Sequence, residues 1–273
     1  MQFNKFLVVF DPTTDSQPAL DRAAMIAGNN ADSAHVHVFS CIYADLGKSG
    51  DSDARVKELV HAQQEILDAA IAPLVAQGLK VTTEIEWQKD WYQAVVQASK
   101  SNAADVVLKS TYKHSATQRL LKKSSDFTLI RECHCAVLLV KAGNSYEARK
   151  VLAAIDSRGS EDSYAKLNGN ILEFCKRFTD SAGTEVHFVS AHKDLASRPD
   201  RGSMVRACGV PTERVHITMG DADDVIVDTA RELGVNLVVV GNSARSGLSA
   251  VVNSNTAEKI VDDLDCDLFA MQG

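Results

Sequence analysis

Short apolar runs alternate along the chain with longer stretches in which apolar residues recur every three to four positions. The runs are rich in valine and leucine and lack the apolar–polar alternation of a sheet with one solvated face. They therefore predict parallel strands that are buried on both faces. The clearest runs are Leu7–Phe10, Val106–Leu108, Ala136–Val140, Leu237–Val240 and Cys266–Met271.

The stretches between the runs have helical periodicity. Apolar residues from Leu167 to Phe178 fall on one helical face. Another helix is expected to begin after Asp221 and to end at Gly234, with an acid at its start and a glycine at its end. Strands that alternate with helices predict a doubly wound parallel α/β sheet. Further helices are expected near Pro18–Ala27, Val56–Leu74 and Trp91–Lys100, and from Thr256.

The whole pattern occurs twice in the same order. FLVVFD (6–11) resembles VLAAID (151–156), HVHVFSCIY (35–43) resembles EVHFVSAH (185–192), ADVVLKS (104–110) resembles NLVVVGN (236–242), and CAVLLVK (135–141) resembles CDLFAMQ (266–272). The order is preserved, which indicates duplication. We expect two tandem domains, 1–145 and 146–273. The second is shorter, because little room for a helix remains between its second and third strands.

Composition narrows the class of protein. The chain is 45% apolar and 24% charged, as globular proteins are. Its net charge of −7 disfavours a direct nucleic-acid partner. No apolar run is long enough to cross a membrane. Six scattered cysteines without a secretion signal indicate reduced thiols in a cytoplasmic protein.

The segment after Leu237–Val240 carries the main functional prediction. Gly241 ends the apolar run, a loop of small residues follows, and a helix is expected to begin near Thr256. Backbone N–H groups in such a loop and at a helix start can bind an anion without a cationic side chain. Asp156 closes the first strand of the same half, where acids of doubly wound sheets lie near the ligand crevice. A phosphorylated ligand, foremost a nucleotide, is the leading hypothesis.

These segments resemble the universal stress protein family in its tandem two-domain form, over nearly the whole chain. The resemblance rests on Asp156, GDADDVIVDTA (220–230), GNSARSGLSA (241–250) and NTAEKIV (255–261), which occur in the family's order. It implies two five-stranded Rossmann-like domains that pair as an intramolecular pseudo-dimer, as single-domain members dimerise. It also implies a stress-response regulatory protein with protein partners, and dimerisation of whole chains is a further expectation.

Family members that have a Gly-x-x-Gly-x9-Gly-Ser/Thr loop after strand four bind ATP, and members without it do not. Gly241 matches the first glycine of this motif, but Ala244 and Ser254 stand at the second and third. The matching loop of the first half, Lys113–Asp126, contains no glycine. The resemblance therefore implies an adenine-nucleotide site in the second domain only, and an altered one.

The candidate binding residues lie around this altered loop. They are Asp156, Gly241, Asn242, Ser243, Arg245, Gly247, Ser254, Asn255 and Thr256. Two alternatives to a nucleotide-controlled protein stay open: a nucleotide-independent protein-interaction module, and a weak ATPase or autophosphorylating protein.

No catalytic residue is assigned, because no triad signature, nucleophile elbow or Walker A lysine motif occurs. Cys133-His134-Cys135 lacks the second ligand pair of a structural zinc site, so no metal is expected. His35 and His37 alternate on an expected strand, and His187 stands on the matching strand of the second half. A metal at these histidines would need a third ligand that the sequence does not place.

Overall fold

The computed structural model describes residues 3–29, 31–46, 52–112, 126–144, 149–156, 162–179, 183–242 and 256–273. Their contacts divide the chain into two compact units. One contains Gln2–Thr111 and Glu132–Val140, and the other contains Tyr112–Arg131 and Lys141–Gly273. The second unit thus takes up a segment that precedes the last strand of the first repeat. The domain boundary after residue 145 stays a prediction.

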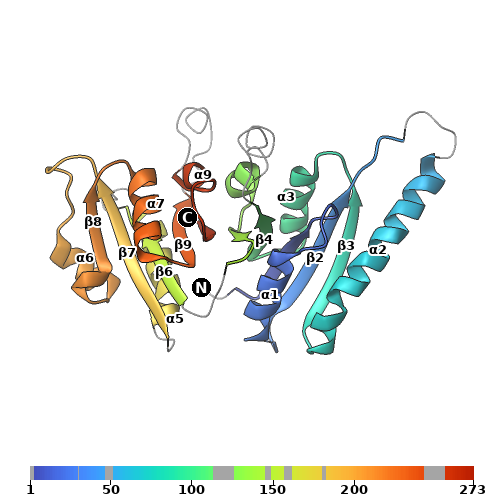
Figure 1. Ribbon diagram of the computed structural model, residues 1–273, viewed down its shortest axis with the longest axis horizontal. Helices are drawn as coiled ribbons and strands as arrows, with labels where there is room; N and C mark the ends of the chain where they lie inside the picture. Colours follow the sequence, from blue (N-terminus) through green and yellow to red (C-terminus); the bar gives the residue numbers. More distant parts are fainter. Residues whose placement is uncertain are drawn as a thin grey trace. The chain divides into compact units, whose positions relative to one another are not determined.

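The first repeat forms a sheet in the order β3-β2-β1-β4-β5. The pairs β1–β2, β1–β4 and β2–β3 are parallel, as the buried apolar runs predict (Figure 1). Its elements are β1 (Lys5–Phe10), α1 (Pro18–Gly28), β2 (His35–Ile42), α2 (Ser52–Ala76), β3 (Lys80–Trp87), α3 (Trp91–Ser101), β4 (Val106–Thr111) and β5 (Ala136–Lys141).

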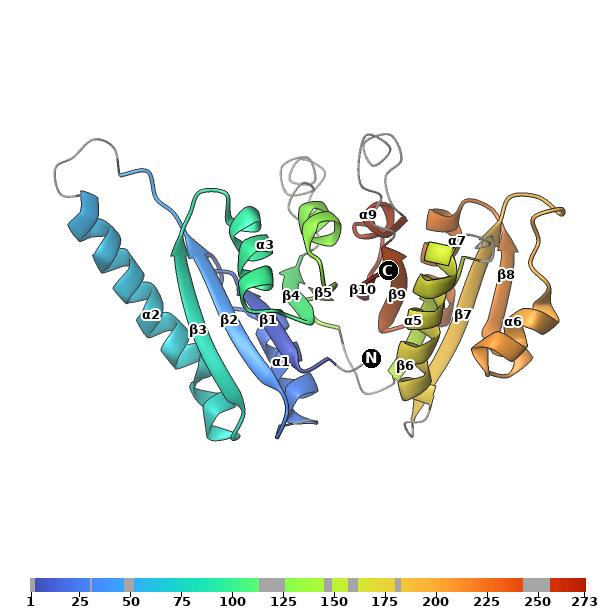
Figure 2. The ribbon, with the colours of Figure 1, turned by 180° about the vertical axis from the view of Figure 1, so that it is seen from behind.

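The second repeat forms the same arrangement in the order β10-β9-β6-β7-β8, again with parallel pairs (Figure 2). The doubly wound α/β prediction is therefore confirmed in both halves. The elements are β6 (Arg149–Ala154), α5 (Asp162–Thr179), β7 (Thr184–His192), α6 (Arg201–Cys208), the 3-10 turn η1 (Thr212–Arg214), β8 (Val215–Met219), α7 (Ala222–Leu233), β9 (Leu237–Asn242), α9 (Thr256–Ile260) and β10 (Asp267–Gln272).

Two local predictions about the second repeat are confirmed. Helix α7 begins after Asp221 and ends at Gly234, whose left-handed backbone (φ 61°) closes the helix without the steric penalty of a side chain. The helix between the second and third strands is short: α6 has 8 residues, whereas its counterpart α2 has 25. The outer strand β8 therefore has much less helix available to cover it than β3 has.

Strand registers extend the match between the first strands of the two halves to their neighbouring strands. Phe6 of β1 pairs with Val106 of β4, and Val151 of β6 pairs with Leu237 of β9. Because Phe6 and Val151 are matching residues of the repeat, Val106 corresponds to Leu237.

This correspondence differs by one residue from the match of ADVVLKS with NLVVVGN. The counterpart of Gly241 in the first half is therefore Ser110 rather than Lys109. The slip has a simple cause: a run of valines resembles itself in neighbouring registers, whereas hydrogen bonding across the sheet allows only one.

Asp105 and Asn236 occupy matching positions and do matching work. The carboxylate Oδ2 of Asp105 accepts from the backbone N–H groups of Asn4 at 2.8 Å and Lys5 at 2.9 Å. Asn236 Oδ1 accepts from the backbone N–H of Lys150 at 3.0 Å. In each half, one side chain before strand four thus satisfies a backbone donor at the start of strand one.

Replacement of Asp105 tests this link. We expect Asp105→Ala to lower the free energy of unfolding by about 1–3 kcal/mol, because two backbone donors lose their acceptor. Asp105→Asn should cost less, since an amide oxygen serves at position 236. Urea unfolding measures both, with the exposed Asp15→Ala as the control. An alanine variant as stable as the wild type would contradict the assignment.

Candidate functional site

The predicted site lies where the strand order of the second repeat reverses. Strands β6 and β9 are neighbours, and the chain winds outward from them in opposite directions. Ligands of doubly wound sheets bind at the carboxyl ends of the strands at this point. Asp156 follows β6, while Gly241 and Asn242 end β9. The structure therefore brings these three predicted residues to one place.

Of the remaining candidates, only Thr256 lies within the described residues. Ser243, Arg245, Gly247, Ser254 and Asn255 lie outside the described residues. Thr256 is the first residue of α9 and is half-buried. Strand β9 also extends two residues beyond the apolar run, since Gly241 and Asn242 still pair with Met271 and Gln272 of β10. The prediction that the run ends at Gly241 and a loop follows is therefore wrong by one residue, since Asn242 still belongs to β9.

Gly241 lies directly against helix α5. A β-carbon added at this position would stand 2.7 Å from Cγ and 3.2 Å from Cδ1 of Leu167. Both distances are shorter than ordinary van der Waals contact. Leu167 itself is only 5% exposed. The absence of a side chain at 241 thus lets an apolar side chain from α5 fill the space beside the strand end, where a ligand phosphate was expected.

The side chain of Asn242 is also committed to the protein. It is 2% exposed, and its Nδ2 donates to the backbone carbonyl of Ile130 and, at 3.1 Å, to Gln272 Oε1. Gln272 Nε2 donates to the same carbonyl at 3.1 Å. Ile130 belongs to the helical residues 126–132, most of which group with this unit. Asn242 therefore anchors a helix, a role for which the sequence offered no sign.

A related hydrogen bond anchors the end of helix α9 in the same unit, where Val261 follows the last helical residue. Lys141, at the end of β5, is buried, and its Nζ donates to the carbonyl of Val261 at 2.8 Å. Lys141 and Val261 are the repeat counterparts of Gln272 and Ile130. Burial lowers the pKa of the Lys141 ammonium, while the surrounding carboxylates, Asp126 foremost, oppose that shift.

The backbone of Asp156 is fixed by an amide side chain. Asn168 Oδ1 accepts from Asp156 N–H at 3.3 Å, and Asn168 Nδ2 donates to the carbonyl of Asp156 at 2.7 Å. In the first half, Gln17 makes the same two contacts with Asp11, at 3.1 and 2.7 Å. In the sequence, the signs of these contacts are an asparagine within an expected helix and a glutamine just before one, because such amide side chains can hydrogen-bond to nearby backbone groups.

The first-half crevice is filled by its own side chains. Ser110, the counterpart of Gly241, accepts from the backbone N–H of Ala19 at 3.0 Å in the first turn of α1. A helix N-terminus that could bind an anion is thereby partly satisfied by a hydroxyl group. Lys109 Nζ donates to the carbonyl of Ser110 at 3.0 Å and lies 5.6 Å from the ring centre of Trp91.

The cysteines are poor nucleophiles. Burial is the main cause that raises the thiol pKa to about 12 for Cys133, Cys175 and Cys266, and to about 11 for Cys41, Cys135 and Cys208. Thiols with such values carry almost no thiolate at neutral pH.

Neither a metal-ligand cluster nor a membrane-spanning helix occurs within the described residues. No cluster of three histidine, cysteine, aspartate or glutamate side chains in the described ranges could hold a metal ion. None of the helices within the same ranges is both long and apolar enough to cross a membrane.

Comparison with known proteins gives a consistent result. The model of the universal stress protein family matches residues 2–141 and 180–271. Universal stress protein E of Escherichia coli K12 is 25% identical over 99% of this chain and 94% of its own length, and its relative from Photorhabdus laumondii is 27% identical over 99% and 95%. A crystal structure of a putative universal stress protein from Pseudomonas aeruginosa aligns with a TM-score of 0.75 and 26% identity, covering 99% of this chain and 93% of the other.

Substitution of Gly241 tests the close contact with α5. We expect Gly241→Ala to lower the free energy of unfolding by about 1–3 kcal/mol, because the new methyl group overpacks against Leu167. In a Leu167→Ala background the same substitution should cost much less, and urea unfolding of the four proteins gives the coupling energy.

The control for Gly241→Ala is Gly169→Ala, at an exposed position of α5 with open space around it. That substitution should stabilise the protein by about 0.5–1 kcal/mol, through the helix propensity of alanine. Equal costs of Gly241→Ala with and without Leu167 would show that the glycine serves another purpose.

Proposed function

We propose that this chain, which belongs to the universal stress protein family, is a stress-response regulatory protein. It acts through protein partners and without a bound nucleotide. The observation that carries the proposal is the contact of Leu167 with Gly241. At the position of the first motif glycine, a leucine side chain packs directly against the strand. The interaction-module hypothesis is thereby favoured.

The chemistry of the strand end supports the same conclusion. An anion site needs backbone N–H groups or polar side chains that face the ligand. Here the amide of Asn242 donates to Ile130 and Gln272, and the amide of Asn168 holds the backbone of Asp156. Helix α9, which follows the loop, has five residues. These groups serve helix packing rather than ligand recognition.

We further propose a cytoplasmic location. None of the six cysteines, all of which lie in the described residues, forms a disulfide, and four of them are buried. Thiols in this number without a disulfide are typical of a reducing compartment.

The competing hypothesis is an adenine nucleotide in the second half, with phosphates near Gly241 and Thr256. It is favoured by the position of Asp156 and Gly241 at the reversal point of the sheet. Weak ATP hydrolysis or autophosphorylation would depend on the same site. One binding experiment therefore separates both nucleotide-dependent hypotheses from the proposed function.

The experiment is thermal unfolding with and without millimolar Mg-ATP. A ligand at 100 times its dissociation constant adds about 2.7 kcal/mol of stability, which corresponds to a rise in Tm of roughly 5–10 °C for a chain of this size. We expect no measurable rise, and no nucleotide in the mass spectrum of material released from the purified protein.

The matched variant is Leu167→Ala, which opens the space beside Gly241. An ATP-dependent rise in this variant alone would identify the leucine as the group that excludes nucleotide. A rise of several degrees in the wild type would overturn the proposal and restore the nucleotide hypothesis.

A further inference from the structure

Each half carries a buried histidine at the same position of its second strand. His37 is opposite Leu7 in the β1–β2 register, and His187 is opposite Leu152 in the β6–β7 register. Leu7 and Leu152 are matching residues of the repeat. The two histidines are 8% and 5% exposed. A buried imidazole needs partners for both ring nitrogens, and each half supplies them differently.

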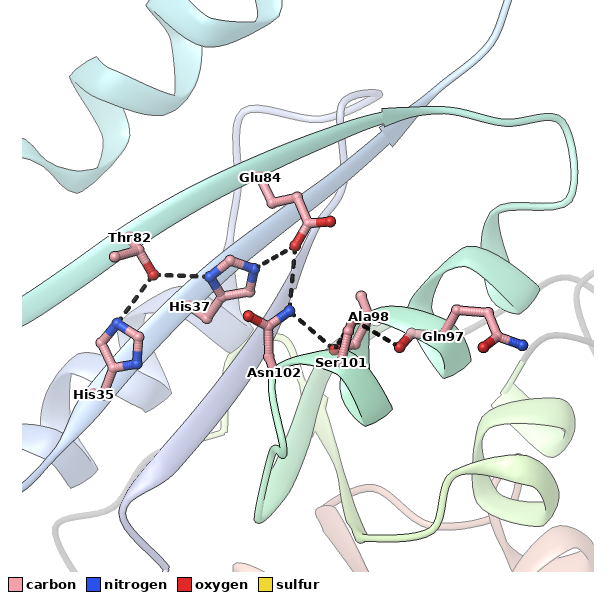
Figure 3. Close-up of polar contacts among 8 residues, drawn as sticks. All are labelled: His35, His37, Thr82, Glu84, Gln97, Ala98, Ser101 and Asn102. Carbon is pink, nitrogen blue, oxygen red and sulfur yellow. Dashed lines mark hydrogen bonds and ion pairs between the residues drawn. The ribbon is translucent and has the colours of Figure 1, made fainter.

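In the first half, a threonine hydroxyl separates two histidines (Figure 3). His37 lies 2.8 Å from Glu84 Oε2 through Nε2, and 2.8 Å from Thr82 Oγ1 through Nδ1. His35 Nε2 lies 3.0 Å from the same hydroxyl oxygen, and Asn102 donates to Glu84 Oε2 at 3.2 Å. An ionised carboxylate only accepts, so Nε2 of His37 carries the proton and Nδ1 accepts from the hydroxyl group.

In the second half, the two histidines touch directly. His187 Nε2 lies 2.7 Å from Glu185 Oε1, and His187 Nδ1 lies 2.9 Å from His216 Nε2. The ring centres are 5.2 Å apart and the ring planes are inclined by 27°. By the same reasoning, His187 donates through Nε2 to the carboxylate and accepts through Nδ1 from His216 Nε2–H.

The glutamate and the second histidine of each cluster stand at exchanged positions in the two halves. Glu185 pairs with Lys150 as His35 pairs with Lys5, so Glu185 stands at the position of His35. In the same way, His216 is opposite Val189 where Glu84 is opposite Phe39. Both halves thus keep one carboxylate and two imidazoles around the central histidine although the positions differ.

The two arrangements respond differently to protons. In the second half, a first added proton can reside on Nδ1 of His216 with both contacts intact. A second would place two N–H groups against each other across 2.9 Å, and the contact between the rings would break. In the first half, the Thr82 hydroxyl can turn its proton away and accept from both rings. Only the second half therefore loses a contact between strands.

We propose that the His187–His216 pair is a proton-sensitive latch, which holds the outer strand β8 on β7 at neutral pH and releases it when both imidazoles are protonated. Strand β8 is the outer strand of its half, and among the described strands it pairs only with β7. The pair spans these two strands, so the loss of its hydrogen bond acts directly on their association.

The charges around the latch set its direction. On β7, Glu185 favours added positive charge, as does Glu232 on α7. Arg201 on α6 opposes it at His216, whereas Lys150 on β6 and Arg214 on η1 favour the ionised form of Glu185.

The pKa of His216 lies below its ordinary value of 6.5, first because the ring is buried and then because of His187 and Arg201. Below pH 6.5, the protein therefore binds more protons when β8 has separated from β7 than when the two strands are paired. The stability that His216 contributes is full above that pH and is lost as the pH falls from 6.5 through the folded-state pKa. The hydrogen bond from His187 lowers the pKa of Glu185 below 4.5, so that carboxylate stays ionised throughout the histidine window.

Helix α2 is tied to the second strand of its sheet, β2, by a side-chain hydrogen bond that α6 does not reproduce at β7 within the described residues. In the first half, Gln63 donates to Ser40 Oγ at 3.2 Å, which ties α2 to the sheet. Ser190 is the counterpart of Ser40 and is 2% exposed, and its hydroxyl has no hydrogen-bond partner within the described part of the chain. Helix α6 supplies no equivalent of Gln63 there.

Hydrogen–deuterium exchange of the full chain at pH 7.5 and 5.5, corrected for intrinsic exchange rates, tests the latch. One proton taken up on release changes the opening equilibrium by up to about tenfold per pH unit. We expect protection of β8 amides to fall several-fold at pH 5.5, while β3 amides keep theirs. Unchanged β8 protection between the two pH values would overturn the proposal.

The variant His216→Gln separates the latch from general acid sensitivity. A glutamine amide can donate to His187 but takes up no proton, so the pH response of β8 should disappear. His35→Gln makes the same change in the first half and should leave that response intact. A response of β8 that persists in folded His216→Gln would refute the latch.

Nitrogen NMR of the histidine rings in the wild-type protein is independent of any variant. The latch requires His187 and His216 to carry their protons on Nε2 at pH 7.5. A proton on Nδ1 of His187 at that pH would contradict the proposal.

Discussion

The close packing of Leu167 against the backbone at Gly241 is the contact on which the second half most depends. Helix α5 can approach the end of β9 only because residue 241 has no side chain. That approach places Asn168 within reach of Asp156, so the end of β6 is fixed at the same time. One small residue thus lets a helix pack on the end of β9, beside the reversal point of the sheet, and brings that helix to the acid after β6.

Duplication has left the two halves with a common scaffold and different fillings. Both use an amide side chain to clamp the acid after strand one, and both use the residue before strand four to satisfy a backbone donor of strand one. At the reversal point, the first half has the hydroxyl of Ser110 bonded to a helix N-terminus and the second has Leu167 packed on a glycine. The two halves are therefore more alike in their backbone than in the chemistry at the reversal point.

The histidine clusters show how a buried polar group limits variation. An unpaired imidazole nitrogen inside the sheet would cost about 1–3 kcal/mol. Each half therefore keeps a carboxylate on one side of the central ring and a hydroxyl or second imidazole on the other. Exchanging the positions of the glutamate and the second histidine leaves the central ring with partners for both nitrogens. It changes, however, whether the hydrogen bond between the strands survives when protons are added.

The amino-acid sequence by itself determined the architecture, since buried parallel strands must be apolar throughout and surface helices must be apolar on one face. It also located Asp156 and Gly241 at one end of the sheet. Only the tertiary structure decided what these residues touch. In the sequence, Leu167 is one of several apolar residues on the buried face of a helix, and only the placement of α5 on β9 shows its contact with Gly241. Asn242 looks like a loop residue in the sequence, and only the structure shows its hydrogen bond to Ile130. Contacts between residues distant in the chain leave no periodic trace, so hydrophobic pattern alone could not show that Leu167 packs against Gly241.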